Sequence, residues 1–448
     1  MSMCISNRRP PPRARVVLLR VSPIDSAMSH RRQFLNLVTM NWANGVSSLR
    51  RLDLHSRHNN LFYPTPAAAE EAAAAAAAQD DPSAPFSNDA FGRRRQVSLK
   101  KVPRLHLPPA PAQSFQHCHD KPCGGRRMAC VALSESQTAF FLEVAYGGSR
   151  RRAFLYDSGE RRVVTLPDLQ SGIYHPICLP VTGGEHGDAA VYIMETLLGR
   201  DTEDEEKKTR ILFQALVHRK YFMETFCQDD WRCDELPPPP YITSISCHAL
   251  VGGGTDVICV STAGVGTYCF DTANRTWSKA GDWALPFFGK IEHDRDLGIW
   301  VGFLSSQRDD AYRLCATTDL FSDTERGRLM EYSDEFWLCR RDDCKDLEPP
   351  YGWYGESLPQ LVGLGSGKFC LVQFFETREE ACTSCQHEEV EDRFAVFTGV
   401  EVVRCGVGSS KDGDGSDKDE RIGALRIVLH KSKRYMLTNF NGTIEFVL

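Results

Sequence analysis

Cysteine and histidine residues form the clusters in this sequence that could do chemistry. Cys382 and Cys385 are separated by two residues and followed closely by His387, which gives three ligands that zinc accepts. A structural zinc site needs two such pairs, so this group is incomplete unless the fold brings the segment HCHDKPC (117–123) beside it. We keep Cys382, Cys385 and His387 as metal candidates. The simpler alternative is that they, like the cysteines of CRRDDC (339–344), are ordinary loop cysteines.

A glycine-rich segment, GLGSGKF (363–369), resembles a phosphate-binding loop only superficially. That loop needs four residues between its first glycine and the Gly-Lys pair, and a serine or threonine after the lysine. Val362 and Phe369 occupy these places, so the segment predicts a turn between two strands. The sequence also lacks the Gly-x-Ser-x-Gly and His-Glu-x-x-His motifs. We therefore predict no catalytic residues, no cofactor and no enzymatic activity.

Basic residues gather at 93–95, 100–101 and 150–152. They could contact phosphates or form a nuclear-import patch, but they lack the interleaved aromatic residues that stack on bases. The chain as a whole has a net charge of −6 and a pI of about 6.1. Nucleic acid is therefore not an expected partner, although a nuclear or chromatin-associated protein remains an alternative.

The composition predicts a protein without a membrane span. No window approaches about 18 uninterrupted apolar residues. The 17 cysteines are odd in number and scattered, and no secretory apolar region precedes them, so we interpret them as mostly reduced thiols. We expect the cytoplasm or the nucleus as the compartment. Residues 1–27 are rich in arginine and nearly free of acid; they are a disordered or mispredicted extension before Met28, or alternatively an organelle transit peptide.

The elements expected before residue 129 are few. Asn44-Gly45 is a strong hairpin signal between two strands at 32–42 and 45–54, and the second strand alternates so poorly that one of its faces should be half-buried. The alanine tract 72–78 predicts a short, exposed helix because it lacks bulky apolar residues. Residues 67–128 should form a low-complexity, irregular insertion, irregular above all from 79 onwards.

From residue 129 onward, short apolar runs recur between Gly, Asp, Asn and Pro clusters, which indicates an all-β protein. Three stretches resemble one another. Their shared positions are Tyr156-Asp157, Val163 and Leu166-Pro167 in the first, Trp231 and Leu236-Pro237 in the second, and Phe270-Asp271, Trp277 and Leu285-Pro286 in the third. The period of roughly 50–60 residues is typical of kelch-type β-propellers. We predict a kelch-like propeller of about six blades at 129–448, with long irregular loops.

Two further expectations follow from this repeat. Strands within 28–66 should join the propeller and close the ring beside the C-terminal strand GTIEFVL, which would remove two sheet edges. Trp277, Trp283 and Trp300 should be largely buried between blades. Substitution of Trp277 by alanine should then cost about 3–5 kcal/mol.

These segments together resemble a known family. The segments that carry the resemblance are RRQFLNLV, GVSSLRRLDL, LFYPTP, GVGTYCFDTANRTWSKAGDWALPFFGKIEH, LGSGKFCLV, FAVFTGVEVV and KSKRYMLTNFNGTIEFVL. They are similar to the plant family DUF1668, a grass-expanded group without an assigned function. The resemblance covers about residues 30–448 and implies a kelch-like propeller that starts near Met28. It implies no activity, cofactor or site residue. Residues 1–27, the alanine tract and HCHDKPC depart from the family pattern.

The sequence therefore favours an interaction scaffold whose protein partners are unknown. In that case the acidic segments 200–208 and 409–421 and the insertion 79–128 would determine which partner binds. The alternative is an enzyme or small-molecule binder with its site at the mouth of the propeller channel. A cluster of titratable side chains at one end of the channel would distinguish the two.

Overall fold

The computed structural model shows an all-β protein. It describes residues 32–41, 43–79, 102, 104–107, 110–116, 128–143, 151–169, 176–182, 189–196, 213–222, 227–240, 243–251, 257–305, 311–318, 320–321, 330–337, 353–378, 390–404, 425–437 and 442–448. In this part of the chain there are twenty-five strands and one helix, α1 (Pro66–Gln79). The all-β class predicted from the sequence is confirmed.

The described strands form five sheets. One sheet has the order β25-β1-β2-β4, built from Gly442–Val447, Phe34–Asn41, Val46–Asp53 and Gln113–Gln116. The second contains β5 (Met128–Ala132), β6 (Gln137–Glu143), β7 (Arg151–Asp157) and β8 (Arg162–Leu169), and the third contains β9 (Pro176–Thr182), β10 (Ala189–Glu195), β11 (Phe213–Phe222) and β12 (Cys227–Glu235).

The remaining two sheets are larger. The eight-stranded sheet has one half made of β13 (Cys247–Val251), β14 (Val257–Thr262), β15 (Gly266–Asp271) and β16 (Thr276–Gly281). Its other half is β17 (Phe287–Asp294), β18 (Ile299–Ser305), β19 (Ala311–Thr317) and β20 (Met330–Trp337), and a short parallel pairing of β13 with β17 joins the halves. The last sheet holds β21 (Trp353–Gly365), β22 (Lys368–Arg378), β23 (Val390–Arg404), β24 (Leu425–Met436) and β3 (Arg104–His106).

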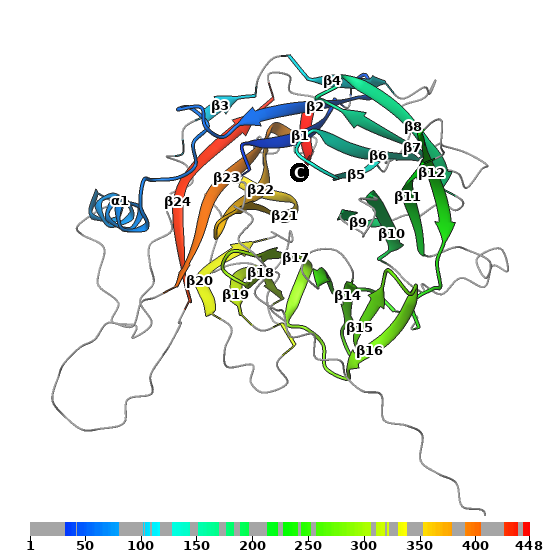
Figure 1. Cartoon of the computed structure of the whole chain (residues 1–448). Coiled ribbons are helices and arrows are strands. Elements are labelled where there is room, and N and C mark those ends of the chain that lie inside the picture. Colours follow the sequence, from blue (N-terminus) through cyan, green and yellow to red (C-terminus); the bar gives the residue numbers. More distant parts are fainter. Residues whose placement is uncertain are drawn as a thin grey trace, which may run out of the picture.

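The sheets follow one another around a common centre (Figure 1), and apolar clusters lie between neighbouring sheets. Strand β6 shows how the alternation of side chains achieves this. Phe140 points toward the sheet of β1, whereas Ala139 and Phe141 pack toward the sheet of β10. A four-stranded sheet buried on both faces cannot be stable alone, so the neighbours depend on one another.

The first and last strands of the chain lie side by side. Strand β25 pairs antiparallel with β1, and a pair of backbone hydrogen bonds joins Asn36 to Leu448, at 3.0 and 2.8 Å. The Gln360 side chain on β21 adds two bonds to β25, to the carbonyl oxygen of Glu445 (3.1 Å) and from the N–H of Val447 (2.9 Å). The predicted pairing of the N-terminal hairpin with GTIEFVL is confirmed.

The repeat found in the sequence corresponds to one structural position. The matching residues Val163, Trp231 and Trp277 lie on β8, β12 and β16, each the last strand of a four-stranded group. All three leucines of the Leu-Pro pairs are buried. At the preceding turns, Asp157 accepts hydrogen bonds from the N–H groups of the residues two and three positions later, at 2.9 and 3.1 Å, and Asp271 does the same, at 2.9 Å for both. Arg161 and Arg275 then adopt a left-handed conformation, with φ of 50° and 54°. The two turns are therefore copies of one another.

A third turn of this kind, after Asp294, was not identified from the sequence repeat. Asp294 ends β17 and accepts a bond from the N–H of Leu297 (2.9 Å), and Trp300 lies six residues later, as Trp277 does after Asp271. The other carboxylate oxygen of Asp294 accepts a hydrogen bond from the N–H of Gly367 (2.6 Å), in the turn between β21 and β22. This copy joins the first two strands of its group rather than the last two, so its position breaks the period.

The tryptophan prediction is only partly correct. Trp300 is buried and stacks on His293, with ring centroids 4.1 Å apart, whereas Trp277 and Trp283 are only half-buried. Trp277 does lie against the apolar cluster between two sheets, but β16 is the outermost strand of its sheet and the ring sits at the rim. Phe270, which pairs with it across the strands, occupies the interior instead.

The structure also refines the N-terminal expectations. The helix predicted from the alanine tract begins earlier, at Pro66. The Thr65 hydroxyl caps it by accepting a hydrogen bond from the N–H of Ala68 (3.1 Å). The helix docks on β24 through buried Ala69 and through the ion pair of Glu70 with Arg426 (2.5 Å). Within the insertion, which was expected to be mostly irregular, the structure shows two short strands. They are β3 and β4, which pair with β24 and β2 and cover sheet edges.

The segment GLGSGKF forms a turn, as predicted. Gly365 pairs with Lys368, and the two residues between them, Ser366 and Gly367, both have positive φ, of 55° and 72°. That pair of conformations suits a two-residue hairpin. A Cβ on Gly367 would lie 2.7 Å from the Val402 carbonyl oxygen, so only glycine fits there.

Candidate functional site

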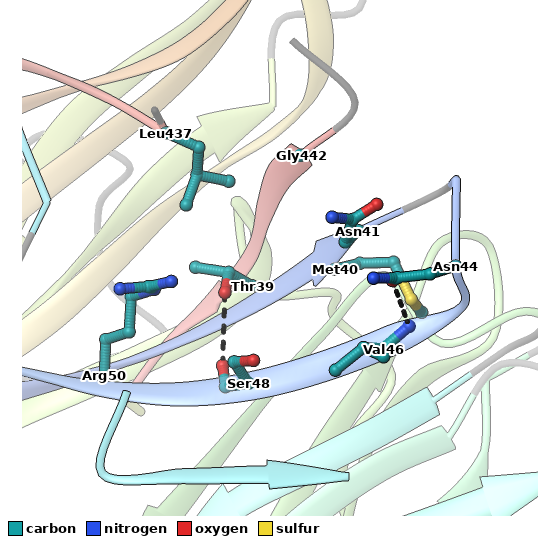
Figure 2. A pocket seen from close by; sticks show the side chains of 9 residues that line it. All are labelled: Thr39, Met40, Asn41, Asn44, Val46, Ser48, Arg50, Leu437 and Gly442. Carbon is teal, nitrogen blue, oxygen red and sulfur yellow. Dashed lines mark hydrogen bonds between the residues drawn. The ribbon is translucent and has the colours of Figure 1, made fainter. Parts of the chain in front are cut away.

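A pocket lies where the β1–β2 hairpin meets the ends of β24 and β25. Its volume is about 180 Å³, and Figure 2 shows the side chains around it. The lining residues are Thr39, Met40, Asn41, Asn44, Val46, Ser48, Arg50, Leu437 and Gly442. The pocket therefore combines apolar side chains with two amides, two hydroxyls and one cation.

The hairpin holds these side chains in place by local hydrogen bonds. Asn44 Oδ1 accepts the N–H of Val46 (3.0 Å), and Asn41 Oδ1 accepts the N–H of Ala43 (3.0 Å). Farther along, the Thr39 hydroxyl donates to the Ser48 carbonyl oxygen across the strands (3.3 Å; Figure 2). These bonds fix the wall of the pocket before any ligand arrives.

Arg50 supplies the positive charge of the pocket. Burial lowers the pKa of its guanidinium, because the surrounding protein replaces part of the water that would stabilise the charge. The nine lining residues include no carboxylate. An anionic group that entered the pocket would meet a partly desolvated cation, where charge interactions are stronger than in water.

A buried histidine on β24 forms a second polar cluster. His430 Nδ1 accepts the N–H of Tyr63 (3.1 Å), which leaves the proton on Nε2, 2.9 Å from Glu401 Oε2. Lys368 Nζ lies 3.7 Å from the other oxygen of Glu401. Burial lowers the pKa of His430 although Glu401 acts in the opposite direction. Both ring nitrogens face protein groups, so the cluster anchors the segment around Tyr63 to the sheet and offers no edge to a substrate.

A third cluster joins the strands β13, β17 and the start of β1. His248 lies opposite Lys290 in register, and Lys290 Nζ is 2.6 Å from Glu292 Oε1. Although His248 keeps some exposure, burial and then the charge of Lys290 lower its pKa to about 3, so it is neutral at ordinary pH. Burial also lowers the pKa of Arg32, against the opposing effect of Glu292. Two cations of this cluster, Arg32 and Lys290, thus share the single carboxylate of Glu292.

The metal candidates Cys382, Cys385 and His387 lie outside the described residues, as do 117–123, 339–344 and the acidic segments 200–208 and 409–421. Their proposed roles therefore stay predictions. Across the described ranges, no group of three or more His, Cys, Asp or Glu side chains could hold a metal ion. Within the same ranges, no helix is long and apolar enough to cross a membrane.

One signal for the pocket is present in the sequence, in the irregular alternation of β2. Val46, Ser48, Arg50 and Leu52 alternate poorly with their neighbours along β2, and the first three line the pocket, whereas Leu52 is buried in the core. The half-buried face predicted for this strand is the wall of the pocket. Leu437 and Gly442 could not be linked to it, because only the pairing of the two chain ends brings them there.

Comparison with known proteins identifies a family but no function. The family model described as "Protein of unknown function (DUF1668)" matches residues 32–435, most of the chain. None of the curated proteins matches the sequence.

Several solved structures resemble parts of the fold. A candidate exo-beta-1,3-galactanase from Bifidobacterium bifidum s17 has a TM-score of 0.31 at 11% identity, covering 66% of this chain and 89% of that one. Hydrazine synthase from Kuenenia stuttgartiensis has a TM-score of 0.28 at 12% identity, covering 59% of each chain. TolB from Acinetobacter baumannii has a TM-score of 0.23 at 11% identity, covering 69% of this chain and 65% of that one. Likenesses of this size support no inference about activity.

Proposed function

The chain belongs to the DUF1668 family, and we propose that it is a non-catalytic scaffold that binds other proteins. In this proposal the sheets are six blades of a closed, kelch-like β-propeller, in which each half of the eight-stranded sheet is one blade. Propellers present loops and inter-blade pockets on a rigid ring, which suits the docking of partners.

Six apolar clusters among the described residues support the closed ring. Each cluster contains residues from two consecutive four-stranded groups. The last one joins Val362, Cys370 and Phe397 to Leu35 and Leu37, and so connects the final group to the first. A row of blades that did not close would leave this face of β1 and β22 in water.

The size of the pocket beside Arg50 is the observation that carries the binding proposal. Small-molecule sites usually measure about 300–1,000 Å³. A volume of about 180 Å³ accommodates little more than one side chain. The pocket therefore suits a single anchoring residue of a protein partner better than a metabolite.

The chemistry of the lining selects the anchor. Arg50 can pair with a carboxylate, and the amides of Asn41 and Asn44 can donate to its oxygens. Met40 and Leu437 would contact the aliphatic part of the same side chain. We expect the partner to insert an aspartate or glutamate carried on an extended segment.

A peptide-display selection against the purified chain tests this proposal. We expect enriched peptides to share an acidic residue. Arg50→Glu should weaken their binding at least tenfold, because a carboxylate pair would then repel, whereas Arg50→Lys should retain part of it. Fluorescence anisotropy of one labelled peptide measures both effects.

The matched control is Arg104→Glu, which makes the same change of charge at an exposed residue of β3. It should leave the affinity unchanged. Equal losses for Arg50→Glu and Arg104→Glu would show a general charge effect, and peptides without an acidic consensus would overturn the proposed anchor.

The alternative, a small-molecule binder, would use the cluster of His248, Lys290, Glu292 and Arg32. In that cluster Glu292 already engages Lys290, at 2.6 Å. The lining of the pocket beside Arg50 includes no carboxylate, so that pocket has the stronger support as a site for an anionic group.

A further inference from the structure

Two cysteines lie directly opposite each other on neighbouring strands. Cys259 on β14 pairs in antiparallel register with Cys269 on β15. Directly opposed residues of an antiparallel pair have Cα atoms about 4.5–5.5 Å apart, which lies within the range that a disulfide spans. Their side chains also point to the same face of the sheet. The backbone thus places these two thiols where they can form a bond without moving the strands.

The thiols already interact and differ in their exposure. Cys259 is fully buried, in the apolar cluster between β13–β16 and β17–β20, whereas Cys269 packs on the edge of that cluster and is partly exposed. The Cys259 S–H donates a hydrogen bond to the sulfur of Cys269. A reagent from solvent can therefore reach one sulfur, with the other in contact behind it.

The hydrogen bond has opposite consequences for the two groups. It lowers the pKa of Cys269, because the thiolate accepts the bond, and burial opposes this only in part. The pKa of Cys259 is raised well above its ordinary value, first by that bond and then by burial. A thiolate is the nucleophilic form of cysteine, so Cys269 is the more reactive of the two.

We propose that Cys269 and Cys259 form a peroxide-reactive dithiol site, in which Cys269 is oxidised first and Cys259 resolves it as a cross-strand disulfide. The Cys269 thiolate attacks one oxygen of hydrogen peroxide; the O–O bond breaks and hydroxide leaves, taking up a proton to become water. The product is a sulfenic acid on Cys269. The sulfur of Cys259 then attacks the sulfur of Cys269, the S–O bond breaks, and a second water leaves with the Cys259 proton. Two thiols are oxidised by two electrons and one peroxide is reduced.

Neighbouring cysteines lack this arrangement. Cys247 lies opposite Ser261, and burial raises its pKa to about 12. Cys315 is fully buried and donates to the carbonyl oxygen of Gly302, at 3.6 Å. These two thiols share the cluster, but the residues directly opposite them are not cysteines, so they serve as internal controls.

Peptide mapping of the full-length chain after stoichiometric peroxide treatment tests the proposal without any substitution. We expect the disulfide Cys259–Cys269 to be the first modification, reversed by dithiothreitol. In Cys259→Ser the sulfenic acid should persist on Cys269 and react with dimedone. In Cys269→Ser residue Cys259 should stay reduced under the same treatment.

Cys315→Ser is the matched control, and it should oxidise as the wild type does. Near-ultraviolet circular dichroism should confirm that each variant is folded. The proposal is overturned if the wild-type pair stays reduced while other cysteines oxidise, or if Cys259 is modified as readily as Cys269 when its partner is serine. This inference is independent of the peptide pocket, since either test can fail alone.

Discussion

Removal of residues 442–448 is expected to prevent the chain from reaching a stable native fold. These residues form β25, whose buried Ile444 and Val447 belong to the cluster that joins the last group of strands to the first. Without them β1 also loses its pairing with β25 and exposes that strand edge, although it still pairs with β2. Because all six clusters depend on neighbours, loss of one junction weakens the whole ring.

Size-exclusion chromatography and near-ultraviolet circular dichroism measure the effect. The truncated protein should elute as aggregate and lack the aromatic signal of packed side chains. The control is the chain begun at Met28, which loses more residues but keeps every described strand, and it should behave as the full chain does. A monomeric, folded product after removal of 442–448 would contradict the closed ring.

Phe270→Ala is expected to destabilise the protein by about 3–5 kcal/mol, the usual cost of a large cavity in a core. Phe270 is fully buried, and its ring meets Phe213 edge-on at 4.8 Å across two sheets. The neighbouring ring of Trp277 contacts Phe270 at 5.1 Å but is only half-buried. Trp277→Ala should therefore cost less, about 2 kcal/mol, partly through its lost indole bond to the Pro237 carbonyl oxygen (2.9 Å).

The shift of the urea unfolding midpoint compares the two variants under one condition. Phe270→Leu keeps most of the apolar volume and should recover much of the loss. An equal or larger effect of Trp277→Ala would mean that the rim of this junction, rather than its interior, holds the two sheets together.

Local patterns in the sequence predicted much of this fold. Asn44-Gly45, the Asp157 and Asp271 turns and the Leu-Pro pairs each depend on residues within a few positions of one another. The local sequence therefore determines their conformation without knowledge of distant contacts. The pairing of β1 with GTIEFVL was also predictable, because the N-terminal hairpin and the C-terminal strand lie outside the repeated units and can complete one sheet together.

Features that depend on contacts between distant strands were less accessible. The burial of Trp277 depends on which strand lies at the rim of the sheet, and the sequence pattern is the same for an inner and an outer strand. Asp294 was missed because its turn falls between different strands of the group. The pairing of Cys259 with Cys269 requires the register of β14 and β15, which depends on the exact position of the turn between these strands.

Disulfide trapping between β1 and β25 tests the closed ring most directly. Met40 and Thr443 lie directly opposite each other and are both buried. In the double variant Met40→Cys with Thr443→Cys, mild oxidation should produce a disulfide that links the two ends of the chain, identified by peptide mapping. The pair Met40→Cys with Ile444→Cys, shifted by one residue to the other face of the strand, should not form it. A closed ring predicts the first result; equal yields from both pairs, or no link in either, would show that β1 and β25 do not close the ring.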